Sequence, residues 1–304
     1  GDITLSGTSL NVGDDITFSA ANYVVANGST NLTIVTSDDK VDFNTGTVKV
    51  GEKTFTIDTD TTDGSTGDNI TFDGDIIGLT HGSSNTAADI SFDAGGSGNV
   101  TVQNIGHTGG NDNTEINGVT LKGALIKTNG KINTVSNSTT DRGTVTITGP
   151  MSLVGSTTIE TDTASSTGSS HLDGNISITG AIDATAGGSR TLTLNSGSGS
   201  IDIGGKIGDS DPLGTVAINA TASPGGAGNE ATGSIAIAGV GKANGTAGTD
   251  TDATFTAGNT NTTLITLDGD DYSFAGNTLF EAASGNTIDS AGATAAVTDY
   301  KTSG

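Results

Sequence analysis

Residues 190–218 read RTLTLNSGSGSIDIGGKIGDSDPLGTVAI, and three four-residue phrases of one pattern lie within this stretch. Each phrase has a polar residue, an aliphatic residue, a small or polar residue and a second aliphatic residue: Thr191–Leu194, Ser200–Ile203 and Thr215–Ile218. Successive side chains of a β-strand point to opposite faces, so the two aliphatic residues of a phrase share one face. Gly and Ser, which are typical of turns, stand between the phrases. The stretch therefore predicts short, half-buried strands joined by turns.

The same phrase recurs along most of the chain. Nine further copies, some with Phe as the second apolar residue, are Asp2–Leu5, Asp15–Phe18, Asn31–Ile34, Asn69–Phe72, Asp89–Phe92, Asn99–Val102, Thr144–Ile147, Asn175–Ile178 and Ser234–Ile237. Internal repetition of this kind is typical of folds in which each repeat stacks on its neighbours. β-Branched residues dominate the phrases, which favours strands over helices.

A parallel β-solenoid explains both the repetition and the low apolar content. Hydrophobic residues make up 32% of the chain and aromatic residues 4%, well below the roughly 45–50% apolar content of ordinary globular domains. The core of a solenoid is a narrow column of side chains from coils ~4.8 Å apart, so few apolar residues suffice. An antiparallel sandwich is less favoured, because few Asn-Gly or Asp-Gly hairpin turns separate the phrases. We therefore expect an all-β fold, a parallel β-helix (β-solenoid), with right-handed crossovers.

Three segments depart from the repeated phrase. Residues 40–57 alternate strongly between apolar and polar residues and are predicted to be an inserted β-hairpin or an inserted pair of strands. Residues 115–135, rich in lysine, are predicted to be a second inserted β segment. Residues 272–304 are expected to form a C-terminal cap or docking segment, which leaves residues 1–271 for the solenoid and its insertions.

Charge and composition restrict the function. The chain carries 34 acidic against 11 basic residues, a net charge of −23, which would repel nucleic acid and anionic membrane surfaces. No run of residues approaches the ~18 apolar residues of a membrane-spanning helix. Because Cys is absent, disulfides, thiolate metal sites and cysteine nucleophiles are excluded. The lack of Cys and the abundance of Thr, Ser, Asn and Gly favour an extracellular protein at the cell surface.

The stretch from Arg190 to Ile218 resembles the coils of filamentous-haemagglutinin-like bacterial β-strand-repeat surface proteins. The likeness is best over residues 170–240 and elsewhere rests on the recurrent phrase alone. The resemblance implies a right-handed parallel β-helix on the cell surface, with a role in adhesion, biofilm or extracellular matrix. It transfers no catalytic residues, and the chain is far shorter than those giant proteins, which favours a self-assembling subunit.

Two acidic runs are candidate calcium sites. Calcium prefers six to eight oxygen ligands, which Asp and loop carbonyls can supply. The spacing of the first run differs by one residue from the regular Asp-x-Asp-x-Asp-Gly pattern of calcium loops. The alternative to a calcium site is a solvated charged turn. The candidate ligands are Asp58, Asp60, Asp63 and Asp68 in the first run, and Asp268, Asp270 and Asp271 in the second.

No catalytic motif is found. The chain has neither a His-Glu-x-x-His element nor a Gly-x-Ser-x-Gly elbow, so zinc or serine hydrolysis lacks support. A carbohydrate-active enzyme would need two carboxylates beside a basic residue on one face of the solenoid. The outward Thr and Ser residues of the phrases supply single columns, whereas an ice-binding surface would need a double array, so strand packing is their expected role. We expect no enzyme and no catalytic residues.

The function favoured by the sequence is structural. We expect a self-assembling subunit of an extracellular filament, sheath or surface layer, joined head to tail by β-strand pairing. The candidate interface residues are Ile3, Thr4 and Leu5 near the N-terminus and Val297 and Tyr300 near the C-terminus. The alternative is an adhesin module that recognises glycans or surfaces through its loops.

Overall fold

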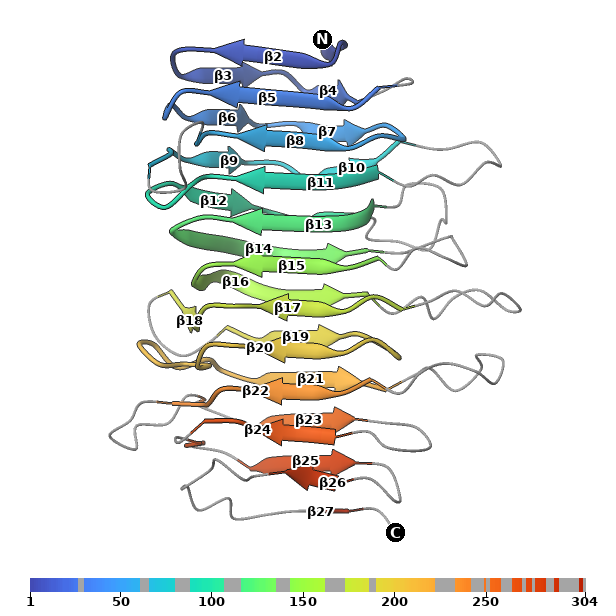
Figure 1. Ribbon diagram of the computed structural model, residues 1–304, viewed down its shortest axis with the longest axis vertical. Helices are drawn as coiled ribbons and strands as arrows, with labels where there is room; N and C mark the ends of the chain where they lie inside the picture. Colours follow the sequence, from blue (N-terminus) through green and yellow to red (C-terminus); the bar gives the residue numbers. More distant parts are fainter. Residues whose placement is uncertain are drawn as a thin grey trace, which may run out of the picture.

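The computed structural model of the chain is a rod of stacked coils (Figure 1). It describes residues 1–26, 30–60, 66–79, 88–106, 116–134, 143–161, 173–185, 190–221, 233–241, 249, 252–257, 264–269, 272–274, 277–282, 287–289 and 301–302. Within these residues the structure is all-β, and neighbouring strands of each sheet are parallel. The expected parallel β-solenoid is confirmed. A helix that could cross a membrane is not found in the described part of the chain.

Each coil contributes to three sides of the rod, which we name I, II and III. Side I is an 11-stranded sheet of β2 (Ser9–Val12), β5 (Leu32–Thr36), β8 (Phe55–Asp58), β11 (Ala88–Asp93), β13 (Ile116–Lys122), β15 (Val145–Thr148), β17 (Ile176–Ile178), β20 (Ile201–Ile203), β22 (Ile235–Ile237), β24 (Leu264–Leu267) and β26 (Thr287–Asp289). Side II holds β3 (Ile16–Ser19), β6 (Val41–Asn44), β9 (Ile70–Phe72), β12 (Asn99–Val102), the first parts of β14 (Leu125–Asn133) and β16 (Met151–Glu160), β18 (Ile182–Ala184), and single bridges at Ile207, Val240 and Tyr272.

Side III completes each coil. It holds β1 (Asp2–Leu5), β4 (Asn22–Val25), β7 (Thr47–Val50), β10 (Ile76–Gly78), a bridge at Ile105, the second parts of β14 and β16, β19 (Leu192–Asn195), β21 (Val216–Ala220), β23 (Ala253–Ala257), β25 (Thr278–Ala282) and β27 (Lys301–Thr302). Because β14 and β16 continue around the corner between sides II and III, a single 12-stranded sheet begins on side II and ends on side III.

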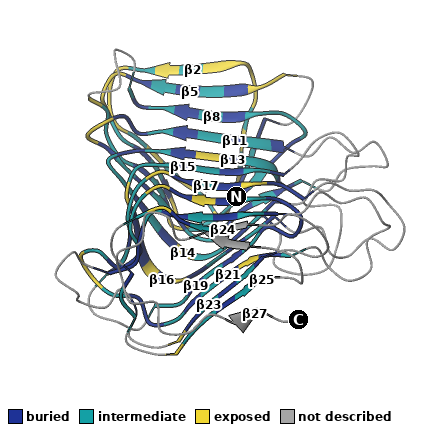
Figure 2. Cartoon of the chain, turned by 60° about the horizontal axis from the view of Figure 1, so that its bottom comes forward, coloured by how far each residue is buried: buried dark blue, intermediate teal, exposed yellow. Residues whose placement is uncertain are grey.

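The core is a stack of equivalent apolar side chains. On side I, Ile176 pairs with Ile201, and Ile201 pairs with Ile235 on the next coil. All three are at most 1% exposed. The residues two positions further along each strand form a second column, and Figure 2 shows the resulting alternation of buried and less buried positions. This is the narrow apolar column that the repeated phrase predicted.

The outward residues of the phrases also stack, but on three different sides. On side I, Thr120 pairs with Thr146 and Thr146 with Ser177 in a single column. Thr101 lies on side II and Thr193 on side III. The hydroxyl residues of the repeat therefore do not all belong to one surface.

Aromatic rings reinforce the N-terminal half of the core. The centroids of Phe18 and Phe43 are 4.6 Å apart, those of Phe43 and Phe72 are 4.7 Å apart, and those of Phe72 and Phe92 are 4.9 Å apart. These pairs have the spacing of stacked rings. At these positions a Phe takes the place of an aliphatic residue in the core column.

The prediction of an inserted hairpin at residues 40–57 is wrong. β6, β7 and β8 lie on three successive sides of the rod, and each pairs in parallel with strands of the coils above and below it. Thr45 and Gly46 have φ values of 60° and 84°, and they bend the chain from side II to side III instead of reversing it. Three strands with short corners have the same apolar alternation as a hairpin, so the pattern alone did not separate the two.

The segment 115–135 is likewise no insertion. It contains β13 on side I and β14 on sides II and III, and both pair in parallel with the neighbouring coils. Within 272–304, β25 pairs in register with β23 and β26 with β24. The coils therefore continue past residue 271, while residues 290–300 lie outside the described residues.

Candidate functional site

Of the predicted calcium ligands, Asp58 is the last residue of β8, and Asp60 and Asp68 lie in the corner that follows it. The Asp58 Oδ1 atom accepts a hydrogen bond from the Asp60 amide at 2.9 Å, and Asp68 Oδ1 accepts one from the Asn69 amide at 2.6 Å. These carboxylates form hydrogen bonds within their own turns. Among the described residues they do not form a group of three potential metal ligands. Asp63, Asp270 and Asp271 lie outside the described residues, and Asp268 is exposed.

A line of charged residues runs across the coils at the same corner. Asp93 pairs in register with Asp58 on one neighbouring coil and with Lys122 on the other. The Lys122 Nζ atom donates to Asp93 Oδ2 at 2.7 Å, and this hydrogen bond raises the pKa of Lys122, although partial burial opposes it. Partial burial raises the pKa of Asp58, and the nearby carboxylates of Asp93 and Asp60 act in the same direction. Lys122 thus balances a stack of carboxylates.

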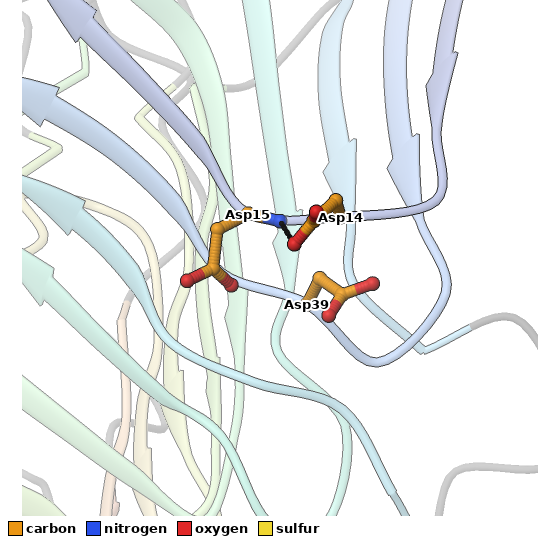
Figure 3. A group of neighbouring side chains, drawn as sticks. All are labelled: Asp14, Asp15 and Asp39. Carbon is orange, nitrogen blue, oxygen red and sulfur yellow. Dashed lines mark hydrogen bonds between the residues drawn. The ribbon is translucent and has the colours of Figure 1, made fainter.

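A second acidic group, which the sequence did not single out, lies near the N-terminal end of the rod (Figure 3). The carboxylate oxygens of Asp14, Asp15 and Asp39 lie within 4.8 Å of one another. Partial burial raises the pKa of Asp39, and the charges of Asp14 and Asp15 raise it further. Asp14 and Asp15 are exposed, and the Lys40 Nζ atom lies 3.6 Å from Asp15 Oδ2. Exposed carboxylates beside a lysine are consistent with a solvated charged turn.

A shallow groove of about 230 Å³ crosses three successive coils on side II. Its lining residues are Thr17, Asp42, Phe43, Asn44, Thr71 and Asp73. The strand register places Asp42 between Thr17 and Thr71, while Phe43 is buried beneath them and is 1% exposed. The groove therefore has a firm apolar floor and a polar rim of hydroxyl, amide and carboxylate groups.

Four of the five polar side chains that line this groove have no hydrogen-bond partner among the described residues. In the part of the chain that the structure describes, the side chains of Thr17, Asn44, Thr71 and Asp73 make no hydrogen bond. The Lys40 Nζ atom lies 3.6 Å from Asp42 Oδ2.

Further along the rod, the polar side chains at the corner between sides II and III pair with each other instead. Asn104 Nδ2 donates to Asp75 Oδ1 at 2.9 Å, and Asn129 Nδ2 donates to Gln103 Oε1 at 2.8 Å. At the groove, by contrast, the corner residues Asn44 and Asp73 do not pair with each other through their side chains.

The N-terminal end of the rod holds the predicted interface residues Ile3, Thr4 and Leu5. They lie in β1, the last strand of its sheet, and β2 and β3 are the last strands of theirs. Inward residues of these three strands are only partly buried, whereas those of β4 and β5 on the next coil are buried. Figure 2 shows this difference between β2 and β5. Val297 and Tyr300 lie outside the described residues.

Comparison with known proteins gives this chain no relatives, because no family model, no curated protein and no solved structure matches it. The resemblance to filamentous-haemagglutinin-like surface proteins stays a prediction. Function is therefore argued from the geometry of the rod alone.

Proposed function

We propose that the protein is a non-enzymatic structural subunit that assembles end to end into an extracellular filament, sheath or surface layer. The observation that supports this most is the open N-terminal coil. There β1, β2 and β3 each end a sheet, so one edge of each strand has no partner among the described strands. Such edges are templates for pairing with another chain.

The apolar side chains of the first coil favour the same partner. Ile3, Leu5, Leu10, Ile16 and Phe18 pack against the core but are only partly buried. A further coil stacked on this end would remove their remaining apolar surface from water, at about 25 cal/mol per Å². A second copy of the rod offers such a coil, because its own strands have the same spacing and the same inward apolar residues.

The direction of assembly follows from the parallel strands. The two ends of the rod differ: β2 ends the 11-stranded sheet at one tip and β26 ends it at the other. A contact between unlike ends does not close on itself, so it generates an open filament. The Asp and Glu excess on the sides, with a net charge of −23 for the chain, would keep neighbouring filaments apart.

The test places a charge at the open tip. Leu10→Lys puts an ammonium group on the inward, half-buried face of β2, and we expect it to abolish filaments in negative-stain microscopy and sedimentation. Asn11→Lys is the matched control, because Asn11 is the exposed neighbour on the same strand. Both variants should keep the β circular dichroism of the parent. Equal filament yield from all three proteins, or no filament from the parent under any condition, would refute the proposal.

The groove on side II favours a second candidate function, recognition of a neutral glycan. Carboxylate and amide oxygens accept hydrogen bonds from sugar hydroxyls, and the Thr hydroxyls both donate and accept. The groove is smaller than the ~300–1,000 Å³ of sites for drug-sized ligands, so it would hold about one sugar ring. Asp42 and Asp73 would disfavour acidic sugars.

Binding of neutral oligosaccharides, measured by calorimetry, tests this candidate. Asp42→Asn and Asp73→Asn should each weaken binding about tenfold, the loss of one charge-assisted hydrogen bond. Asp202→Asn, an exposed change on side I, should leave it unchanged. Asp42 lies beside Lys40 and shares the groove with Asp73, so the same samples should be assayed for new reducing ends. Release of reducing ends would show that the groove hydrolyses glycans instead of only binding them. If no oligosaccharide binds, glycan recognition is refuted.

A further inference from the structure

Three successive corners between sides III and I are closed by the same buried hydrogen bond. The hydroxyl of Thr134 donates to the Gly143 carbonyl at 2.7 Å, that of Thr161 to the Gly174 carbonyl at 2.6 Å, and that of Ser196 to the Gly199 carbonyl at 2.6 Å. The three hydroxyl residues are each 0% exposed. They stack on one another, because the Thr134 amide donates to the Glu160 carbonyl and the Thr161 amide to the Asn195 carbonyl.

The bonded carbonyl always stands at the same place relative to the next strand. Gly143, Gly174 and Gly199 each lie two residues before the first residue of β15, β17 and β20. The sequence separation between hydroxyl and carbonyl nevertheless varies: 9, 13 and 3 residues. The base of the corner is therefore the same whether the segment that leaves it is short or long.

The glycines form a second column that faces the hydroxyl column. A Cβ atom on Gly174 would lie 1.9 Å from the Gly143 carbonyl oxygen, and one on Gly199 would lie 2.0 Å from the Gly174 carbonyl oxygen. Real Cβ atoms are not found at such distances, so only glycine lets the bases of successive corners stack this closely. The base of each corner is thus packed into the rod.

The corner between sides I and II repeats the arrangement. The Thr36 hydroxyl donates to the Asp39 carbonyl and the Thr59 hydroxyl to the Asp68 carbonyl, with separations of 3 and 9 residues. Here too the carbonyl residue lies two positions before the next strand, β6 or β9. The hydrogen bond therefore belongs to the corner and not to one loop sequence.

We propose that these hydroxyl-to-carbonyl bonds are clamps that fix strand register independently of segment length, so that the edge between sides III and I can display segments of any length and sequence. Once the hydroxyl and the carbonyl are hydrogen-bonded, the register of the strands before and after the corner is fixed relative to the neighbouring coil. The length of the segment between them is then not what sets the register of these two strands. This display function concerns the long edge of the rod and goes beyond assembly at its tips.

A natural contrast marks where a clamp is missing. Ala220 stacks on Ser196, because the Ser196 amide donates to the Asn219 carbonyl, and Gly233 takes the glycine position of that corner. A Cβ atom on Gly233 would lie 2.2 Å from the Gly199 carbonyl oxygen and 3.0 Å from that of Ala220. Ala220→Ser should therefore add a clamp to the Gly233 carbonyl and raise the melting temperature.

The principal experiment varies the segment and the clamp together. In one variant, residues 135–142 are replaced by Gly-Ser, the spacing of the Ser196 corner. In another, an eight-residue epitope peptide is inserted between residues 138 and 139. We expect both to keep the melting temperature and the β circular dichroism of the parent, and the epitope to be captured by its antibody on the folded rod.

Thr134→Val, made in all three proteins, removes the clamp. We expect a lower melting temperature, with the largest drop in the protein with the inserted epitope, and faster amide exchange of Val145 and Ile147. Thr146→Val, on the outward face of β15, is the control, and its effect on the melting temperature should not depend on segment length. The proposal is overturned if shortening or lengthening the segment itself unfolds the rod, or if Thr134→Val acts equally at every length. If Thr134→Val does not fold at all, Ala220→Ser decides, and no gain in its melting temperature then overturns the clamp.

Discussion

Single residues at the corners decide how closely two coils approach. Gly174 is one of a column of glycines whose missing side chains leave room for the carbonyl of the coil below. Gly13 is the opposite case, since a Cβ atom there would meet nothing within 4 Å. Two residues of the same type thus have different roles, one in packing and one in an open turn.

This difference gives a matched pair of variants. Gly174→Ala forces a methyl group against the Gly143 carbonyl and should lower the free energy of unfolding by roughly 1–3 kcal/mol or more. Gly13→Ala should change it by no more than about 0.5 kcal/mol. Guanidinium unfolding followed by circular dichroism measures both. Equal effects would mean that the glycine column is not tightly packed.

Asp58 gives a prediction about pH. Because its pKa is raised from the ordinary value of 3.8, the folded protein holds this proton more tightly than the unfolded chain does. The contribution to stability is greatest below the ordinary value and falls as the pH rises through the raised pKa. Asp58→Asn keeps the oxygen that accepts from the Asp60 amide, so at pH 7 it should raise the melting temperature.

The gain from Asp58→Asn should vanish at pH 3, where both proteins are uncharged at this position. Asp202→Asn, on the same side but exposed, should have no effect at either pH. Thermal melts at the two pH values make the comparison, and a gain that persists at pH 3 would contradict the electrostatic cause.

At the scale of the strand, stability comes from pairing like with like across coils. Ile201 in β20 is held between Ile176 and Ile235, while its neighbour Asp202 points outward and is exposed. Ile201→Ala should cost about 2–5 kcal/mol. Asp202→Ala should stay within about 0.5 kcal/mol of the parent. If the two changes were equal in urea unfolding, the inward column would not be the core.

The strands were predictable because their signal is local. Ile201, Asp202 and Ile203 show the alternation of a half-buried strand, and the stacking of such phrases followed from their repetition. The corners were not predictable in the same way, since Thr45 and Gly46 look alike in a hairpin and in a turn between two sides. Their direction is set by pairing with neighbouring coils whose strands are distant in the sequence.

The groove and the clamps also depend on register. Thr17, Asp42 and Thr71 meet only because loops of unequal length bring successive strands into line. The clamps left a trace in the sequence, a glycine two residues before a strand, as at Gly143 and Gly174. That trace has meaning only when the hydroxyl residue at the other end of the segment is known.

For the whole molecule, the open first coil should be the least protected part of a dispersed rod. Its inward side chains are only half-buried, so we expect amides of β1–β3 to exchange with deuterium faster than those of β15 and β17. After assembly the first coil should become as protected as the middle of the rod. Mass spectrometry of dispersed and polymerised samples compares the two states, and unchanged exchange at β1–β3 in polymers would place the contact elsewhere.

The order in which the sheets pair has a consequence for how the chain acquires its shape. On side I, β2 pairs with β5, β5 with β8 and β8 with β11, always with the strand of the adjacent coil. Each new coil can therefore pair with the preceding coil, which is already folded, and does not need the coils that follow it in the sequence. A polypeptide that emerges N-terminus first from a narrow pore would thus fold coil by coil outside the pore. The folded coils would then prevent the chain from sliding back through it.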